Sequence, residues 1–385
     1  MAHMIPYPGP FLAGVVIFAI IVVDAFEAVI LPRRVTRRLR LVRLFFWTTW
    51  TSWKLVTKHI SNRRTRETLV GIYGPIALLA LIGVWAVGLV MGFALMQYGA
   101  GSALDAHGTS SGFWTDSYMS GTTFFTLGLG DVIPRSAVAR TLVVTEGGFG
   151  FAFLAAMIGY LPFIYGSFSK REVDISLLDA RAGTPPSAGE LLRRHSYKDG
   201  PEALRELLKD WELWSAELME SHLSYPMLAY FRSQHDNQSW IGALTAILDT
   251  CALLRVGIEG MCVRQADLTF AIARHAVVDL AQVFATPPKP LPYERLTSEE
   301  LRHMREVLAQ HGLKLRQGQE ADRDLAKLRE MYEPYVHALA SYLDHALPPW
   351  IPKKGTKDNW QTTAWAKATG MLGEQEDSLA PEQHF

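Results

Sequence analysis

The chain has 385 residues, of which 49% are hydrophobic, and it carries 38 basic and 38 acidic residues. The zero net charge hides an asymmetry: residues 1–169 carry 13 Lys and Arg against 7 Asp and Glu, whereas residues 170–385 carry 25 against 31. The two cysteines, Cys251 and Cys262, form neither a disulfide framework nor a Cys-x-x-Cys metal motif. These values exclude a disulfide-stapled secreted domain and are typical of a basic membrane-facing part joined to an acidic soluble part.

Three segments are apolar and long enough to cross a membrane. Residues 11–31 are apolar except for Asp24 and Glu27, whereas residues 75–98 and 147–169 contain no charged residue. At ~1.5 Å per residue, a helix over each segment spans the ~30 Å hydrocarbon core of a bilayer. Asp24 and Glu27 share one helical face, where they could pair with nearby arginines or with the following helix, or form a modulatory ion or proton site.

A basic and aromatic segment, residues 33–69, separates the first two spans. Its basic cluster consists of Arg33, Arg34, Arg37, Arg38, Arg40 and Arg43. Tryptophans follow at positions 47, 50 and 53. This pattern predicts a helix in the inner membrane interface, with its rings at headgroup depth and its arginines near anionic lipid. It could serve as a topology anchor or in lipid-regulated gating. Because the arginines lie outside the spans, we expect no voltage sensor.

The distribution of basic residues predicts the orientation of the chain. Eleven Lys and Arg lie between residues 32 and 69, whereas only Arg135 lies between residues 99 and 138. The more basic side of a membrane protein faces the cytoplasm. We therefore expect a multi-pass protein of the cell membrane with its N-terminus outside and its C-terminal part in the cytoplasm.

The most informative motif follows the second span. It consists of Thr126, Leu127, Gly128, Leu129, Gly130 and Asp131. The glycines allow a backbone whose successive carbonyls face one way, and a ring of carbonyls can replace the water around a bare cation. One such loop leaves gaps in the ring, whereas four chains around an axis close it. The motif therefore predicts an ion-selectivity filter in a homotetramer.

This motif resembles the selectivity filter of potassium channels, which usually reads Thr-Val-Gly-Tyr-Gly-Asp. The resemblance covers residues 74–169 and implies a pore helix over residues 116–125. Three positions after the motif match the family spacing as well, namely Pro134, Arg140 and Gly150. The family's Val and Tyr are Leu127 and Leu129 here, so the tyrosine hydroxyl that braces the filter is replaced by a side chain that can only pack.

The resemblance also implies roles for the loop residues. K⁺ is expected to be held by carbonyl oxygens, those of Thr126, Leu127, Gly128 and Leu129. The Thr126 hydroxyl adds an oxygen at the inner end. Gly130 permits the turn at the top, and Asp131 lies at the outer mouth, where it draws cations and bonds toward the pore helix. No organic cofactor is predicted.

Three residues of the last span, whose helix is expected to begin near Val138, are candidates for gating. Glu146 is a costly charge within a span. We expect it to brace the loop from behind through pore-helix hydroxyls such as Thr122 or Thr123, with proton-coupled gating as the alternative. Gly150 could be a hinge or a close-packing position, and Pro162 a second kink.

The C-terminal part shows helical periodicity without a notable alternating strand pattern. The predicted helices are residues 201–223, 226–234, 238–257, 264–285, 298–311 and 320–347. The sequence lacks the Gly-x-Gly-x-x-Gly turn of a Rossmann domain. Residues 232–240 are expected to form a turn between helices capped by Asp236 or Asn237, with a small-ligand pocket as the alternative. Because no catalytic constellation is visible, we predict that the protein is not an enzyme.

The sequence therefore predicts an all-α membrane protein in five parts. They are an N-terminal transmembrane helix (1–32), a basic interfacial helix (33–69), a tetrameric pore domain of two spans, pore helix and filter (70–169), a helical cytoplasmic domain (170–370) and a disordered tail (371–385). The predicted function is potassium-selective conduction gated by the cytoplasmic domain. A weakly selective cation channel and a non-conducting membrane-anchored regulatory protein are the alternatives. Expected partners are further copies of the chain, anionic lipid at the inner leaflet, and an unidentified small ligand or protein at the cytoplasmic domain, with no nucleic acid.

Overall fold

The computed structural model describes residues 5–31, 41–102, 104–106, 112–235, 237–258, 260–352 and 358–361. Nearly all of their regular structure is helical, which confirms the predicted all-α membrane fold. The chain divides into two compact units. The first unit comprises Met1–Ser167 together with Ser224–Phe231, and the second comprises Phe168–Leu223 together with Arg232–Phe385. The return of residues 224–231 to the first unit was not predicted from the sequence.

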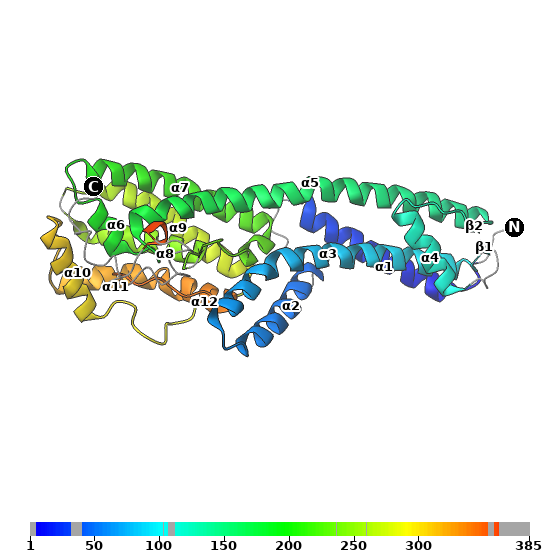
Figure 1. Ribbon diagram of the computed structural model, residues 1–385, viewed down its shortest axis with the longest axis horizontal. Helices are drawn as coiled ribbons and strands as arrows, with labels where there is room; N and C mark the ends of the chain where they lie inside the picture. The colour runs from blue at the N-terminus through cyan, green and yellow to red at the C-terminus, as the bar shows by residue number, and fades with distance from the viewer. Residues whose placement is uncertain are drawn as a thin grey trace. The chain divides into compact units, whose positions relative to one another are not determined.

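The first unit consists of long helices around a short helix and a small strand pair. Its elements are α1 (Pro8–Val29), α2 (Leu41–Lys58), α3 (Arg63–Gly99), β1 (Leu104–Ala106), α4 (Phe113–Phe124), β2 (Val132–Pro134) and the part of α5 (Ala137–Ala182) up to Ser167. Figure 1 shows α1 lying along α3, with α4 near the C-terminal end of α3. The two strands pair antiparallel on either side of α4 in the sequence, so they close the segment that holds it.

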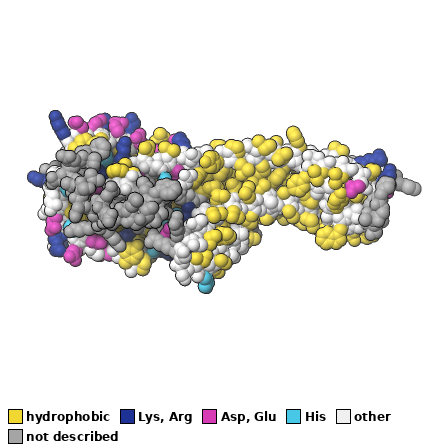
Figure 2. Space-filling model, in the orientation of Figure 1, with side chains coloured by type: hydrophobic (Ala, Val, Ile, Leu, Met, Phe, Trp, Pro, Cys, Tyr) yellow, Lys and Arg dark blue, Asp and Glu magenta, His cyan; other side chains and the backbone are white. Residues whose placement is uncertain are grey.

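Among the described residues, four helices are long and apolar enough to cross a membrane, namely α1, α3, α5 and α8 (Trp240–Gly257). Large apolar side chains are exposed along the first three, among them Val16, Val87 and Phe151, and Figure 2 shows a broad hydrophobic surface over this unit. The apolar stretch of α8 is instead 89% buried within the protein. Its apolar surface is covered by other helices, as in the core of a soluble domain.

Helices α1 and α3 pack at glycines that let their backbones approach closely. A Cβ atom on Gly14 would lie 2.5 Å from the Gly92 carbonyl oxygen, and one on Gly99 would lie 2.5 Å from the Phe11 nitrogen. Such small-residue contacts are a common way for membrane helices to associate. Asp24 of α1 also contributes to this packing. Its buried carboxylate accepts hydrogen bonds from Trp85 Nε1 at 2.9 Å and from the Val42 backbone nitrogen of α2 at 3.3 Å. Asp24 therefore joins three helices.

Helix α2 packs one aromatic face against α3. Phe46 and Trp50 are buried, Trp47 is exposed, and Trp53 donates through Nε1 to the Leu69 carbonyl at 3.1 Å. Of the predicted basic cluster, Arg43 lies in α2. The remaining members, Arg33, Arg34, Arg37, Arg38 and Arg40, lie outside the described residues, as does the predicted tail 371–385.

Two helices of this unit extend further than expected. Helix α3 begins at Arg63, well before the predicted span, so residues 63–69 belong to it rather than to a separate linker. Helix α5 continues to Ala182, beyond the predicted end of the pore domain at residue 169. In both cases helix-forming charged residues carry the helix beyond its apolar segment. Helix α3 runs through Gly71, Gly74 and Pro75, whereas residues 170–182 of α5 contain no proline or glycine.

The second unit is helical and starts within α5 at Phe168. Its further elements are α6 (Ala188–Arg194), α7 (Gly200–Ser224), α8, α9 (Val263–Val283), α10 (Ser298–Gln310), α11 (Gln319–Glu330), α12 (Glu333–Leu343) and η2 (Asn359–Gln361). The predicted helix 320–347 is two helices, because Pro334 occupies the first turn of α12 and cannot continue α11. The predicted helix 226–234 is only the 3-10 turn η1 (Pro226–Tyr230), which belongs to the first unit.

Candidate functional site

The loop Thr126–Asp131 leaves α4 at its C-terminal end. The Leu127 nitrogen donates to the Thr122 carbonyl at 2.8 Å, and the Thr126 nitrogen donates to the Thr123 carbonyl at 3.0 Å. These bonds use carbonyls that a helix end otherwise leaves unpaired. They fix the first turn of the loop to α4, so that any shift of α4 moves the loop with it.

The sign of φ alternates along the loop backbone. Thr126, Gly128 and Gly130 have φ of 59°, 56° and 78°, whereas Leu127 and Leu129 between them have negative φ. An alternation of right- and left-handed residues turns successive N–H groups to one side of a chain and hence successive carbonyls to the other. Glycine adopts positive φ at little cost, but Thr126 does so only because its surroundings impose it. The unusual conformation of Thr126 was not predicted from the sequence.

Asp131, which ends the loop, is held from α4. Its Oδ2 accepts a hydrogen bond of 2.8 Å from the hydroxyl of Tyr118. The side chains of Leu127 and Leu129 are exposed and form no comparable polar contact among the described residues. The contact of Tyr118 with Asp131 was not predicted from the sequence, although Tyr118 lies on the predicted pore helix, thirteen residues before Asp131.

Gly150 lies where α5 passes the end of α4. A Cβ atom there would lie 2.1 Å from the Phe124 carbonyl oxygen and 2.9 Å from the Phe124 carbonyl carbon. Helix α5 is unbroken through Gly150 and through Pro162, which lies inside it. Gly150 was considered as a hinge or as a close-packing position, and its close approach to Phe124 is that of a close-packing position. Phe124 is the last residue of α4, so Gly150 sets how near α5 can come to the loop.

Glu146 lies one turn before Gly150 and is fully buried. Its Oε1 contacts the hydroxyl of Ser120 on α4, and its Oε2 has no hydrogen-bond partner among the described residues. Ser120 also donates to the Val90 carbonyl of α3 at 2.7 Å. The expected brace between α5 and α4 therefore runs through Ser120, not through Thr122 or Thr123, and it includes α3.

A second cluster surrounds η1. The Tyr230 ring stacks on Phe46 of α2 at a centroid distance of 5.1 Å, and it also meets Trp50 and Tyr73 at 5.6 Å. A Cβ atom on Gly74 of α3 would lie 2.9 Å from the Tyr230 carbonyl oxygen. The aromatic end of η1 is therefore seated between α2 and α3.

The other end of this segment contacts α5. The Tyr160 hydroxyl lies 3.3 Å from Met227 Sδ, and the Tyr225 ring lies 4.9 Å from the Phe163 ring and 5.8 Å from the Tyr160 ring. Tyr160 and Phe163 flank Pro162 in the sequence. Residues 224–231 thus connect the part of α5 around Pro162 with α2 and α3, all within the first unit.

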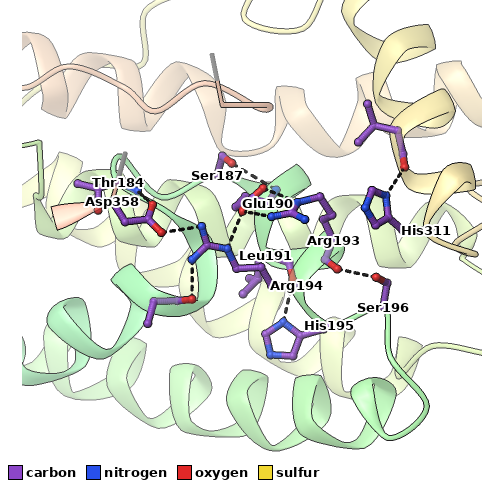
Figure 3. Close-up of polar contacts among 12 residues, drawn as sticks. Thr184, Ser187, Glu190, Leu191, Arg193, Arg194, His195, Ser196, His311 and Asp358 are labelled. Atoms are coloured by element: carbon purple, nitrogen blue, oxygen red, sulfur yellow. Dashed lines mark hydrogen bonds and ion pairs between the residues drawn. The ribbon is translucent and has the colours of Figure 1, made fainter. Parts of the chain in front are cut away.

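The polar groups of the second unit are largely satisfied internally. Burial acts to raise the pKa of the Glu190 carboxyl, but hydrogen bonds from Arg193 and Arg194 lower this pKa overall. Arg194 Nη2 also bonds Asp358 Oδ2 at 2.7 Å, and Asp358 Oδ1 accepts from the Thr184 nitrogen at 3.2 Å. In Figure 3 these side chains converge on one another. These contacts tie residues 358–361 to α6, and they engage Arg193 and Arg194 in ion pairs with Glu190 and Asp358.

The polar stretch 232–240 connects η1 to α8. The cap of α8 is Ser239, whose hydroxyl accepts from the Gly242 nitrogen at 2.9 Å, and not Asn237 as expected; Asp236 lies outside the described residues. Arg232 Nη2 donates to the carbonyls of Leu343 and Asp344 at 2.8 and 2.7 Å. The described contacts are those of a connection between helices.

Comparison with protein families finds a match for part of the chain. Residues 77–162 match a family model described as "Ion channel". The matched segment runs from α3 through α4 and the Thr126–Asp131 loop into α5 as far as Pro162. No curated protein and no solved structure matches the chain. The match identifies this segment as an ion-channel domain, and with the apolar helices it makes the chain a multi-pass membrane protein.

Proposed function

We propose that the protein is a potassium-selective channel formed by four copies of the chain. The observation that carries the proposal is the alternating backbone of Thr126–Gly130, placed at the end of α4 within an ion-channel domain. An alternation of right- and left-handed residues would turn successive carbonyls the same way, which is what coordination of a dehydrated cation requires. K⁺ is the transported ion, and the ligands would be the carbonyl oxygens of Thr126, Leu127, Gly128 and Leu129.

The tetramer follows from the geometry of a single loop. One loop supplies oxygen atoms on one side of an ion only, and a cyclic assembly supplies the other sides. The exposure of Leu127 and Leu129 in the single chain agrees with a surface that is covered in an assembly. Asp131 would place four carboxylates at the outer mouth, where a ring of acidic groups concentrates cations.

Ion flux from liposomes tests this function. We expect rapid flux of K⁺ and Rb⁺ and little flux of Na⁺, and we expect Gly128→Ala to abolish it, because alanine at a φ of 56° costs about 1–2 kcal/mol in each subunit. Gly166→Ala is the matched control, because a Cβ atom at that position meets nothing within 4 Å. Equal flux of Na⁺ and K⁺ would instead favour a weakly selective cation channel. This alternative is suggested by Leu129 in place of the family's Tyr, and by Phe125, which precedes Thr126 where the family often has another Thr.

We also propose that the second unit gates the pore through residues 224–231. The chain leaves the second unit at Leu223 and returns to it at Arg232, so its position constrains both ends of this segment. Between those ends the segment contacts α5 through Tyr225 and Met227, and α2 and α3 through Tyr230. A rearrangement of the second unit would therefore act on the part of α5 around Pro162.

Replacing Tyr230 with alanine is expected to change the open probability at least tenfold. Truncating a buried aromatic side chain costs about 3–5 kcal/mol, and each 1.4 kcal/mol corresponds to a factor of ten in an equilibrium constant. The change is measured as open probability in lipid bilayers. Tyr293→Ala is the control, because Tyr293 is exposed in the second unit. Equal open probabilities of Tyr230→Ala and wild type would contradict this coupling.

A further inference from the structure

The buried contact of Ser120 with Glu146 and Val90 contains too few hydrogen atoms if Glu146 is ionised. A serine hydroxyl carries one hydrogen and can donate only one hydrogen bond. Ser120 Oγ lies 2.7 Å from the Val90 carbonyl oxygen, which can only accept. Ser120 Oγ is also in hydrogen-bond contact with Glu146 Oε1, and a carboxylate oxygen can only accept as well.

Both contacts are hydrogen bonds only if Glu146 carries a proton. The Ser120 hydroxyl then donates to the Val90 carbonyl, and the Glu146 carboxyl donates to the vacant lone pair of Ser120 Oγ. With an ionised Glu146, either the Val90 or the Glu146 contact would bring two acceptors together with no hydrogen between them. Such a contact is repulsive, and a buried polar atom left unsatisfied costs about 1–3 kcal/mol.

Among the residues that the structure describes, the helices packed around α5 offer no cation to neutralise a carboxylate at Glu146. The sequences of α1 and α4 contain no Lys or Arg, and α3 contains none after Arg66. The acidic groups of these helices have other partners, since Asp116 accepts from Ser102 at 2.6 Å and Asp24 accepts from Trp85 at 2.9 Å.

The remaining titratable groups nearby are also occupied. Tyr118 of α4 donates to Asp131, and Arg140, on α5 itself, donates through Nε to the Pro134 carbonyl. Helix α1, which contains Glu27 and Asp24, contains no basic residue. Because Glu146 is fully buried, an unpaired charge there would carry a large desolvation cost.

We propose that Glu146 is a neutral carboxylic acid and that its proton positions α4 between α3 and α5. Ser120 lies six residues before Thr126, on the helix whose end fixes the loop. Loss of the proton turns a donor into an acceptor and separates α5 from α4 behind the loop. The consequence for conduction rests on the proposed function, whereas the protonation state of Glu146 does not.

Infrared spectroscopy of the purified protein tests the protonation state without requiring conduction. At neutral pH, the spectrum of wild type minus that of Glu146→Gln should contain the C=O stretch of a protonated carboxyl group, shifted in deuterated water. Carboxylate stretches in its place would overturn the proposal. Ser120→Ala should shift the C=O band because the acid loses its acceptor, whereas Ser117→Ala, whose hydroxyl bonds the Phe113 carbonyl instead, should leave it in place. An unshifted band in Ser120→Ala would refute the assigned partner.

The pH dependence of flux tests the consequence for conduction. Wild-type flux of K⁺ should be lost reversibly as the pH is raised, because an ionised Glu146 cannot donate to Ser120. Glu146→Gln should keep its flux at alkaline pH, because the amide N–H donates in the same place and does not titrate. Identical alkaline loss in both proteins would overturn the positioning role. If neither protein conducts at any pH, the proposed function fails, and the infrared result alone decides the state of Glu146.

Discussion

Replacing Gly150 with alanine is expected to abolish ion flux. The new methyl group would lie 2.1 Å from the Phe124 carbonyl oxygen, closer than any real contact of a Cβ atom. The obstructing atom belongs to the backbone at the end of α4, so no side-chain rotation can relieve the clash. Either α5 or α4 must move, and the loop that begins two residues later moves with α4. Flux of K⁺ from liposomes measures the loss.

Gly148→Ala is the matched control for this experiment. It introduces the same methyl group into the same helix two residues away, and a Cβ atom there meets nothing within 4 Å in the chain. We expect its flux to be within about twofold of wild type, because alanine is also the better helix former, by about 1 kcal/mol. Wild-type flux in Gly150→Ala would show that α5 does not constrain the loop in this way. A hinge function of Gly150 would instead leave K⁺-dependent thermal stabilisation of the protein unchanged while altering its open probability.

Replacing Arg295 with alanine is expected to destabilise the second unit by about 3–5 kcal/mol. Arg295 lies between two buried acids: its Nη2 is 2.7 Å from Asp249 Oδ2, and its Nη1 is 3.0 Å from Glu333 Oε1. It also donates to the Pro348 carbonyl at 2.9 Å. Burial raises the pKa of Asp249, and the Arg295 guanidinium opposes this rise. Removing the guanidinium leaves Asp249 in the core without a counter-charge, whereas Glu333 keeps Arg329 Nε at 3.2 Å.

Urea unfolding of the full chain in detergent measures this loss as a lower midpoint for the second unit. Arg302→Ala is the control, because Arg302 lies on the surface of α10 with 69% of its side chain exposed, and such changes are usually within about 0.5 kcal/mol. Asp249→Asn should recover part of the loss when added to Arg295→Ala, because it removes one uncompensated charge. A midpoint in Arg295→Ala equal to that of the control would contradict the importance of this network.

The membrane spans and the pore loop follow from local sequence properties. Three uncharged or nearly uncharged segments predict α1, α3 and α5, because burial in a bilayer depends on composition alone. The loop conformation is also prepared locally, since Gly128 and Gly130 tolerate positive φ. The ends of α3 and α5 were misjudged because hydropathy marks where a span leaves the bilayer and not where a helix stops.

The contacts that hold the loop depend on tertiary structure and were not predictable from local patterns. Tyr118 reaches Asp131, and Ser120 reaches both Val90 and Glu146, only because α4 is placed between α3 and α5. The return of Tyr230 to α2 and α3 joins residues far apart in the sequence. Periodicity describes the buried face of one helix but not which distant segment covers it.

The most direct test is a single-channel recording across a planar bilayer with K⁺ on one side and Na⁺ on the other. Carbonyl coordination by Thr126–Leu129 in a four-chain ring predicts discrete unitary currents that reverse near the equilibrium potential of K⁺ and vanish in Gly128→Ala. Currents that reverse near zero would contradict potassium selectivity, and a purified protein that produces no unitary current under these conditions would contradict the channel itself.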